Sequence, residues 1–224
     1  MVLQIIAKLT RGESILPVDS TKDKRTDIDS ESDMVDAENI KNNVSTQHLE
    51  TPVNVIYQTA EDGLGDTIKP RLLAAGADCT KVMVIDDSEQ PLTMADVRLE
   101  EAIVQTKARM VVLDPIQGFL GSEVDMHRAN EIRPLMKRIA VLAEKYHCAI
   151  ILIGHMNKNS NGKSSYRGLG SIDIMAAVRS LLFIGKVKKD PTTRVLIHEK
   201  SSLAPPGETM AFKLGDEEGF RWVG

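Results

Sequence analysis

The stretch MVVLDPIQGF (110–119) decides the fold. Its first four residues are apolar, and Asp114 and Pro115 end the run, because proline cannot continue a strand ladder. A strand that is apolar throughout is typical of a parallel sheet whose two faces are both buried. The stretch therefore predicts a central strand over 109–114 that ends in a carboxylate.

The segments around this strand alternate between two patterns. Short apolar runs predict further strands at 53–59, 81–86 and 149–155, and 3.6-residue periodicity predicts helices at 1–11, 65–76, 93–107, 127–147 and 171–178. We expect Gly12 and Gly76 to end two of these helices, Thr93 to cap a third, and Pro134 to mark either a kink or a fresh start within a fourth. Strand–helix alternation predicts a doubly wound, mostly parallel α/β fold. Later runs at 180–187, 194–200, 210–214 and 220–223 predict antiparallel hairpins that extend one edge of that sheet.

Length and composition bound the class of protein. At 224 residues, with 42% hydrophobic residues, the sequence predicts one domain (1–224) with a full core over 53–224. Residues 17–51 are polar and predict a long surface insert without regular structure. The net charge of −4 argues against a generally basic nucleic-acid coat but permits a local basic patch. No apolar run is long enough to span a membrane and no signal peptide is evident, so we expect a cytoplasmic protein.

Polar side chains follow three of the predicted strands at the point where each strand ends. Glu61 and Asp62 follow 53–59, Asp114 ends 109–114, and His155 ends 149–155. Ligands bind at the carboxyl ends of the strands in an open α/β sheet. Each residue has an ordinary structural explanation as a turn or strand-end residue. Their joint order nevertheless predicts one site across that edge, with carboxylates suited to general-base work or to a metal.

Four stretches resemble the RecA-like P-loop ATPases, and among them the RepA-like hexameric helicase ATPases of plasmids and phages, relatives of DnaB and RadA. The stretches are VIYQTAEDGLGDTIKPRLLAAG, MVVLDPIQGF, RANEIRPLMKRIAVLAEKYHCAIILIGHMNK and YRGLGSIDIMAAVRSLLFI. The resemblance implies Mg²⁺-dependent ATP hydrolysis. Glu61 would be the carboxylate that activates water, Asp114 the Walker B aspartate that holds Mg²⁺ through its water shell, and His155 the sensor of the γ-phosphate.

The resemblance also implies partners. The loop NKNSNGKSSYRGLG (157–170) would face single-stranded DNA in the centre of a ring, most simply a hexamer, with Lys158, Lys163 and Arg167 on the phosphates. An ordinary solvated loop is the alternative for this segment. Lys200 would match a lysine that reaches a neighbouring subunit's ATP. Ser202 stands where an arginine is expected, and Arg167 or Arg179 would substitute for it.

The sequence contains no complete phosphate-binding loop of the kind that P-loop ATPases use. Gly162-Lys163-Ser164 looks like the end of G-x-x-x-x-G-K-[ST], but Asn157 stands at the first glycine and no helical pattern follows. The helix at 2–11 resembles the helix that follows this loop in the family, so we expect the first strand and the loop ahead of Met1. Either the sequence begins inside the motif, which we favour, or the ATPase is degenerate.

The functions to be distinguished are therefore three. The first is a ring-forming, DNA-associated, helicase-like ATPase whose activity is impaired in this chain without its phosphate loop. The second is a RadA-like recombination or repair ATPase, and the third is a non-hydrolysing module for assembly or DNA binding.

Overall fold

A four-stranded parallel sheet forms the centre of the computed structural model, which describes residues 1–15, 51–155, 172–214 and 220–223. The strands lie in the order β2-β1-β3-β4, with β1 at Val55–Thr59, β2 at Val82–Met83, β3 at Met110–Asp114 and β4 at Ala149–Leu152. β1 and β3 pair along five residues, from Val55 with Met110 to Thr59 with Asp114. The predicted parallel sheet is confirmed.

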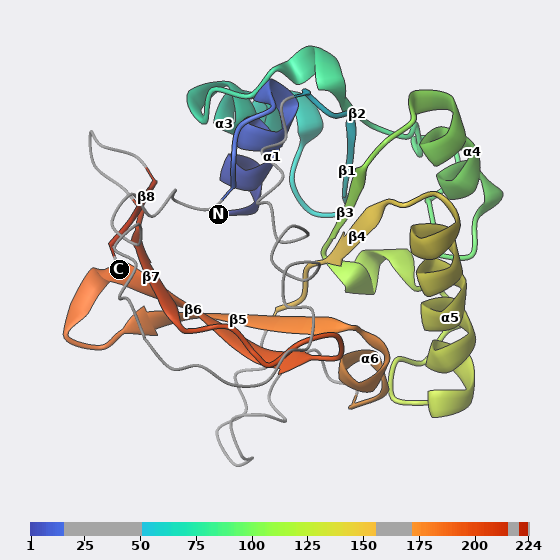
Figure 1. Ribbon diagram of the computed structural model, residues 1–224. Helices are drawn as coiled ribbons and strands as arrows, with labels where there is room; N and C mark the ends of the chain where they lie inside the picture. Colours follow the sequence, from blue (N-terminus) through green and yellow to red (C-terminus); the bar gives the residue numbers. More distant parts are fainter. Residues whose placement is uncertain (16–50, 156–171, 215–219, 224) are drawn as a thin grey trace, which may run out of the picture.

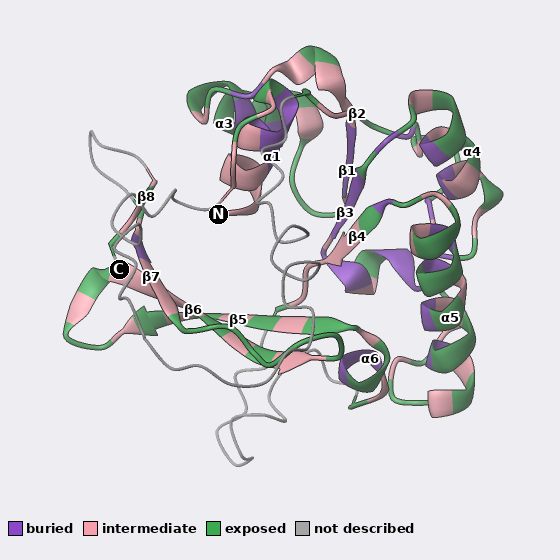
Figure 2. Ribbon diagram, in the orientation of Figure 1, coloured by how far each residue is buried: buried purple, intermediate pink, exposed green. Residues whose placement is uncertain are grey.

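Helices cover both faces of this sheet (Figure 1). α1 (Val2–Arg11) and α3 (Lys69–Ala74) pack on one face, and α4 (Val97–Thr106) and α5 (Ala129–Lys145) pack on the other. The central strands are accordingly buried on both sides (Figure 2). No helix in the described part of the chain is both long and apolar enough to cross a membrane.

α1 runs antiparallel to β1. Its last turn lies beside the start of that strand, where the Val53 N–H donates to the Leu9 carbonyl at 3.1 Å. Gly12 ends the helix at φ 74°, in the left-handed region that glycine adopts at least cost, as predicted. Met1 offers no side-chain cap at the other end. The first turn of α1 therefore points toward the edge of the sheet where the strands finish.

β2 is shorter than the run 81–86 predicts. Only Val82 and Met83 pair with β1. Beyond them the buried amide of Gln58 donates to the Ile85 carbonyl and accepts from the Ile85 N–H, both at 3.0 Å. A side chain thus replaces the strand ladder, which explains why the backbone leaves the sheet after two residues.

Other element boundaries differ in detail from the predictions. A π-helical turn, η1 (Leu64–Ile68), precedes α3. Asp96, and not Thr93, caps α4, because its carboxylate accepts from the Arg98 N–H at 2.9 Å. α5 continues through Pro134. The predicted polar insert at 17–51 lies outside the described residues except for Thr51.

The later strands form the predicted antiparallel hairpins, but in a sheet of their own. They pair in the order β5-β6-β7-β8, with β5 at Ser180–Val187, β6 at Asp190–Ser201, β7 at Met210–Lys213 and β8 at Arg221–Trp222. α6 (Ile172–Ala177) leads into them. The prediction that they extend the parallel sheet is therefore wrong. β4 offers only four residues for pairing, whereas β5 and β6 satisfy each other's backbone along most of their length.

A close contact fixes the turn after β1 against the turn after β3. A short 3₁₀ helix, η3 (Ile116–Phe119), follows the Asp114–Pro115 cis peptide. A Cβ atom placed on Gly118 in this helix would overlap the Cβ of Ala60. The backbone of η3 can therefore approach the turn that carries Glu61 only because residue 118 has no side chain.

Replacing Gly118 with alanine should lower the free energy of unfolding by about 1–3 kcal/mol, the usual cost of overpacking a tight contact. Thermal and urea unfolding measure this change. Gly65→Ala is the matched control, because nothing lies within 4 Å of a Cβ at Gly65. Equal stability of the two variants would contradict the contact.

Candidate active site

Three strand ends meet at one edge of the parallel sheet. Thr59 at the end of β1 pairs with Asp114 at the end of β3, and the Ala60 N–H donates to the Asp114 carbonyl at 2.9 Å. The Ile153 N–H beyond β4 donates to the Leu113 carbonyl at 3.0 Å. These backbone bonds bring the residues that follow β1, β3 and β4 into one neighbourhood.

Glu61 and His155 face each other at this edge. The His155 Nε2 lies 3.5 Å from a carboxylate oxygen of Glu61, and the two side chains are 66% and 64% exposed, respectively. The Thr59 hydroxyl holds the turn, accepting from the N–H groups of Glu61 and Asp62 at 3.3 and 3.1 Å. A pair this exposed contributes little to stability. The pair matters because it places the solvent-exposed Glu61 carboxylate at the edge of the sheet where the strands end.

Asp62 differs from its neighbour because it already has a cationic partner. The Arg71 guanidinium lies 3.1 Å from its Oδ2. Arg71 comes from α3, on the face of the sheet that carries α1. Of the two carboxylates predicted after β1, Glu61 is therefore the one directed toward the residues after β4.

Asp114 is half-buried and is held by a residue that the sequence analysis did not single out. The Tyr57 hydroxyl donates to the Asp114 Oδ2 at 2.6 Å. Burial, and then the hydrogen bond and negative charge of Asp114, raise the pKa of Tyr57 above its ordinary value, so the phenol stays protonated. Among the described residues, no side-chain donor contacts the other oxygen, Oδ1. The carboxylate thus keeps one oxygen for another ligand.

The first turn of α1 points toward this same edge. Tyr57 of β1 and Val112 of β3 pack in the cluster that also contains Ile6 and Ala7 of α1. Backbone N–H groups and the positive end of the helix dipole favour anions at such a terminus.

Lys200 lies on β6 and is bound within its own chain. Its ammonium donates to the carbonyls of Met175, Ala176 and Val178 at 3.1, 2.6 and 2.8 Å. Met175 and Ala176 belong to the last turn of α6 and Val178 follows it, so the ammonium lies at the C-terminal end of the helix, where a cation is favourable. Arg179 follows Val178 and is exposed. The predicted DNA contacts Lys158, Lys163 and Arg167, and the Gly162-Lys163-Ser164 sequence, lie outside the described residues.

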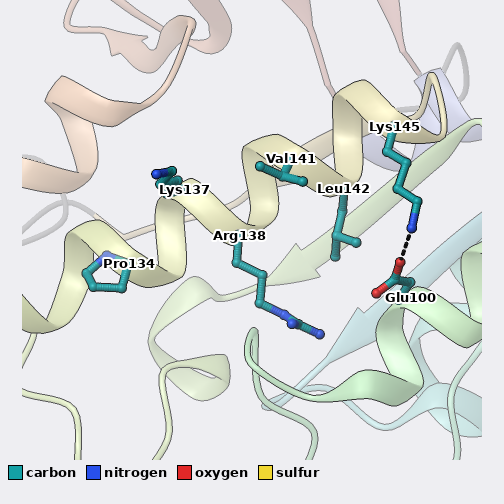
Figure 3. A pocket seen from close by; sticks show the side chains of 7 residues that line it. All are labelled: Glu100, Pro134, Lys137, Arg138, Val141, Leu142 and Lys145. Atoms are coloured by element: carbon teal, nitrogen blue, oxygen red, sulfur yellow. Dashed lines mark hydrogen bonds and ion pairs between the residues drawn. The ribbon is translucent and has the colours of Figure 1, made fainter.

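A separate cavity of about 490 Å³ lies between α4 and α5 (Figure 3). Its lining combines charged and apolar side chains: Glu100, Pro134, Lys137, Arg138, Val141, Leu142 and Lys145. Lys145 and Tyr146 both contact the Glu100 carboxylate, at 2.9 and 2.7 Å. None of the predicted site residues lines this cavity, so it is distinct from the strand-end site.

Comparison with known families identifies the class. A family model described as the AAA domain matches residues 39–161, which is more than half of the chain. The chain belongs to the AAA-domain family. The match includes Glu61, Asp114 and His155 and supports the predicted relationship to RecA-like P-loop ATPases. No curated protein matches the sequence.

Solved structures confirm the RecA-like fold of this AAA-domain protein. The RadB recombinase is 17% identical with a TM-score of 0.54, and the match covers 77% of this chain and 80% of the recombinase chain. A solved ATPase domain of another protein is 13% identical, with a TM-score of 0.56 and coverages of 76% and 74%. A DnaB-like replicative helicase is 14% identical, with a TM-score of 0.57; the match covers 74% of this chain and 50% of the helicase chain.

Replacing Lys200 with methionine should lower the free energy of unfolding by about 1–3 kcal/mol, because three carbonyls lose a charged donor. Urea unfolding followed by circular dichroism measures it. Lys186→Met on β5 removes the same charge without those carbonyls and should change stability little. Indistinguishable midpoints for the two variants would refute the anchoring of α6 by Lys200.

Proposed function

We propose that the chain is the core of a ring-forming, DNA-associated ATPase of the helicase type, which hydrolyses ATP with Mg²⁺. The observation that carries the proposal is the meeting of Glu61 and Asp114 at neighbouring strand ends, with His155 beside Glu61. Phosphoryl transfer to water depends mainly on positioning and charge neutralisation. Two carboxylates in different environments, one exposed and one held, suit these two tasks.

Glu61 would orient and activate the attacking water. Its side chain is exposed and lies beside His155, which would report on the γ-phosphate. Asp114 suits Mg²⁺, because a hard cation prefers carboxylate oxygens and keeps several waters and substrate phosphates as its other ligands. When bound, the ion would neutralise charge on the phosphates. The N-terminal turn of α1 would favour the phosphates on the same side.

A positive charge from a neighbouring subunit would complete the site in a ring, which we propose to be a hexamer. Lys200 would supply it only after releasing the carbonyls of α6 that it now binds. Arg167 or Arg179 would act in its place. Arg179 is exposed and follows α6 closely, so it needs no such release.

Recombination or repair is the second candidate function, favoured by the similarity to the RadB recombinase. Strand displacement separates the two: a helicase unwinds a tailed duplex with ATP, whereas a recombinase exchanges strands without progressive unwinding. A non-hydrolysing assembly or DNA-binding module would do neither. We further propose that residues 1–224 act as one unit, with 17–51 as a polar insert.

The chain by itself should bind MgATP weakly, because its 224 residues include no complete phosphate-binding loop. Isothermal calorimetry measures the affinity. A micromolar dissociation constant would refute this expectation.

Glu61→Gln should abolish ATP hydrolysis while sparing nucleotide binding, with both variants and the original chain compared at saturating MgATP. The amide keeps the shape of the side chain but cannot act as a base, so we expect a loss of about 10²–10³-fold in kcat. Phosphate release measures turnover. Asp62→Asn is the control, because Arg71 already binds that carboxylate. Normal turnover by the Glu61 variant would exclude its catalytic role.

Simultaneous replacement of Lys158, Lys163 and Arg167 with alanine should weaken single-stranded DNA binding. It should also make the slope of log K against log salt concentration less steep by about 2, because about three phosphate contacts are lost. Fluorescence anisotropy at several salt concentrations measures both. Alanine at Lys186, Lys188 and Lys189 removes equal charge near the β5–β6 turn and should change them less. Equal effects of the two triple variants would refute the proposal that the loop 157–170 contacts single-stranded DNA.

A further inference from the structure

The hydroxyl of Tyr57 is the one side-chain donor that contacts Asp114 in the described part of the chain. The tyrosine is 2% exposed and is packed among residues of α1 and α3. Its hydroxyl oxygen lies 2.6 Å from the Oδ2 of Asp114. A short bond from a buried donor to a carboxylate is among the stronger hydrogen bonds in proteins.

The register of the sheet creates this contact. Tyr57 pairs with Val112, and Asp114 lies two residues farther along β3. Side chains two residues apart on a strand point to the same face, so the phenol reaches the carboxylate diagonally across the ladder. The ring belongs to the same core cluster as Val112, which leaves it little freedom to turn away.

We propose that Tyr57 is a positioning residue for a metal site. By holding Oδ2, it fixes the Asp114 carboxylate so that Oδ1 alone is presented to a divalent cation and its water shell. The inference rests on the proposed role of Asp114 in metal binding. Tyr57 touches neither the ion nor the nucleotide and acts through Asp114. Hydrogen-bond partners of this kind orient metal ligands, and their loss typically weakens metal binding about 10- to 100-fold.

Phenylalanine at Tyr57 would keep the buried ring and remove only the donor. Oδ2 would then lose its partner in a half-buried position, and the carboxylate would rotate to find solvent or the ion.

The test is the binding of Mn²⁺ alone to the full chain. Electron paramagnetic resonance measures the concentration of free Mn²⁺ and so the amount bound. We expect Tyr57→Phe to weaken the Asp114-dependent site about 10-fold. Tyr146→Phe is the matched control: its hydroxyl also donates to a carboxylate, Glu100, at 2.7 Å, but between α4 and α5. It should leave the affinity for Mn²⁺ unchanged.

Asp114→Ala separates failure of the inference from failure of the proposed function. If this variant binds Mn²⁺ as the original chain does, or if the original chain shows no binding, Asp114 is not the metal ligand and both proposals fall. If Asp114→Ala loses binding but Tyr57→Phe retains it in full, only the role of Tyr57 is overturned. Thermal unfolding of Tyr57→Phe is measured in parallel, and a fall in stability with unchanged Mn²⁺ affinity would make Tyr57 a structural residue only.

Discussion

The parallel pairing of β1 with β3 is the constraint on which the rest of the structure depends. Five residues of each strand are in register, and both faces of the pair are covered by helices. A slip of one residue would turn every buried side chain to the opposite face and would separate Tyr57 from Asp114. Burial of the apolar residues on both faces therefore specifies the geometry of the site as well as the core.

The three acidic residues near this edge show how one fold prepares carboxylates for different tasks. Asp62 is neutralised by Arg71, Asp114 is held through one oxygen by a buried phenol, and Glu61 remains exposed beside His155. Charge, hydrogen bonding and solvent access thus differ among carboxylates at two neighbouring strand ends. Under the proposed function, the held carboxylate of Asp114 would suit a metal and the exposed carboxylate of Glu61 would suit water.

Most of the parallel sheet could be predicted from the sequence because its strands are short apolar runs that end in polar residues. Glu61, Asp114 and His155 could be placed together for the same reason, since parallel strands finish at one edge. Tyr57 was missed because an aromatic residue inside an apolar run looks like core, and only the tertiary pairing shows its hydroxyl reaching Asp114. The early end of β2 likewise depends on the amide of Gln58, and the contacts of Lys200 join residues 22 to 25 positions apart. Local patterns carry no information about such contacts. The separate antiparallel sheet was missed because sequence periodicity identifies strands but not their neighbours.

The contact between Ala60 and Gly118 also has a consequence for how sequences of this fold can diverge. The two residues share a space that holds one methyl group, so their identities are not independent. Alanine at residue 118 would be accommodated if residue 60 were glycine, whereas two alanines would collide. An exchange of the two residues therefore requires Ala60 to become glycine before Gly118 becomes alanine. The accessible intermediate has glycine at both positions.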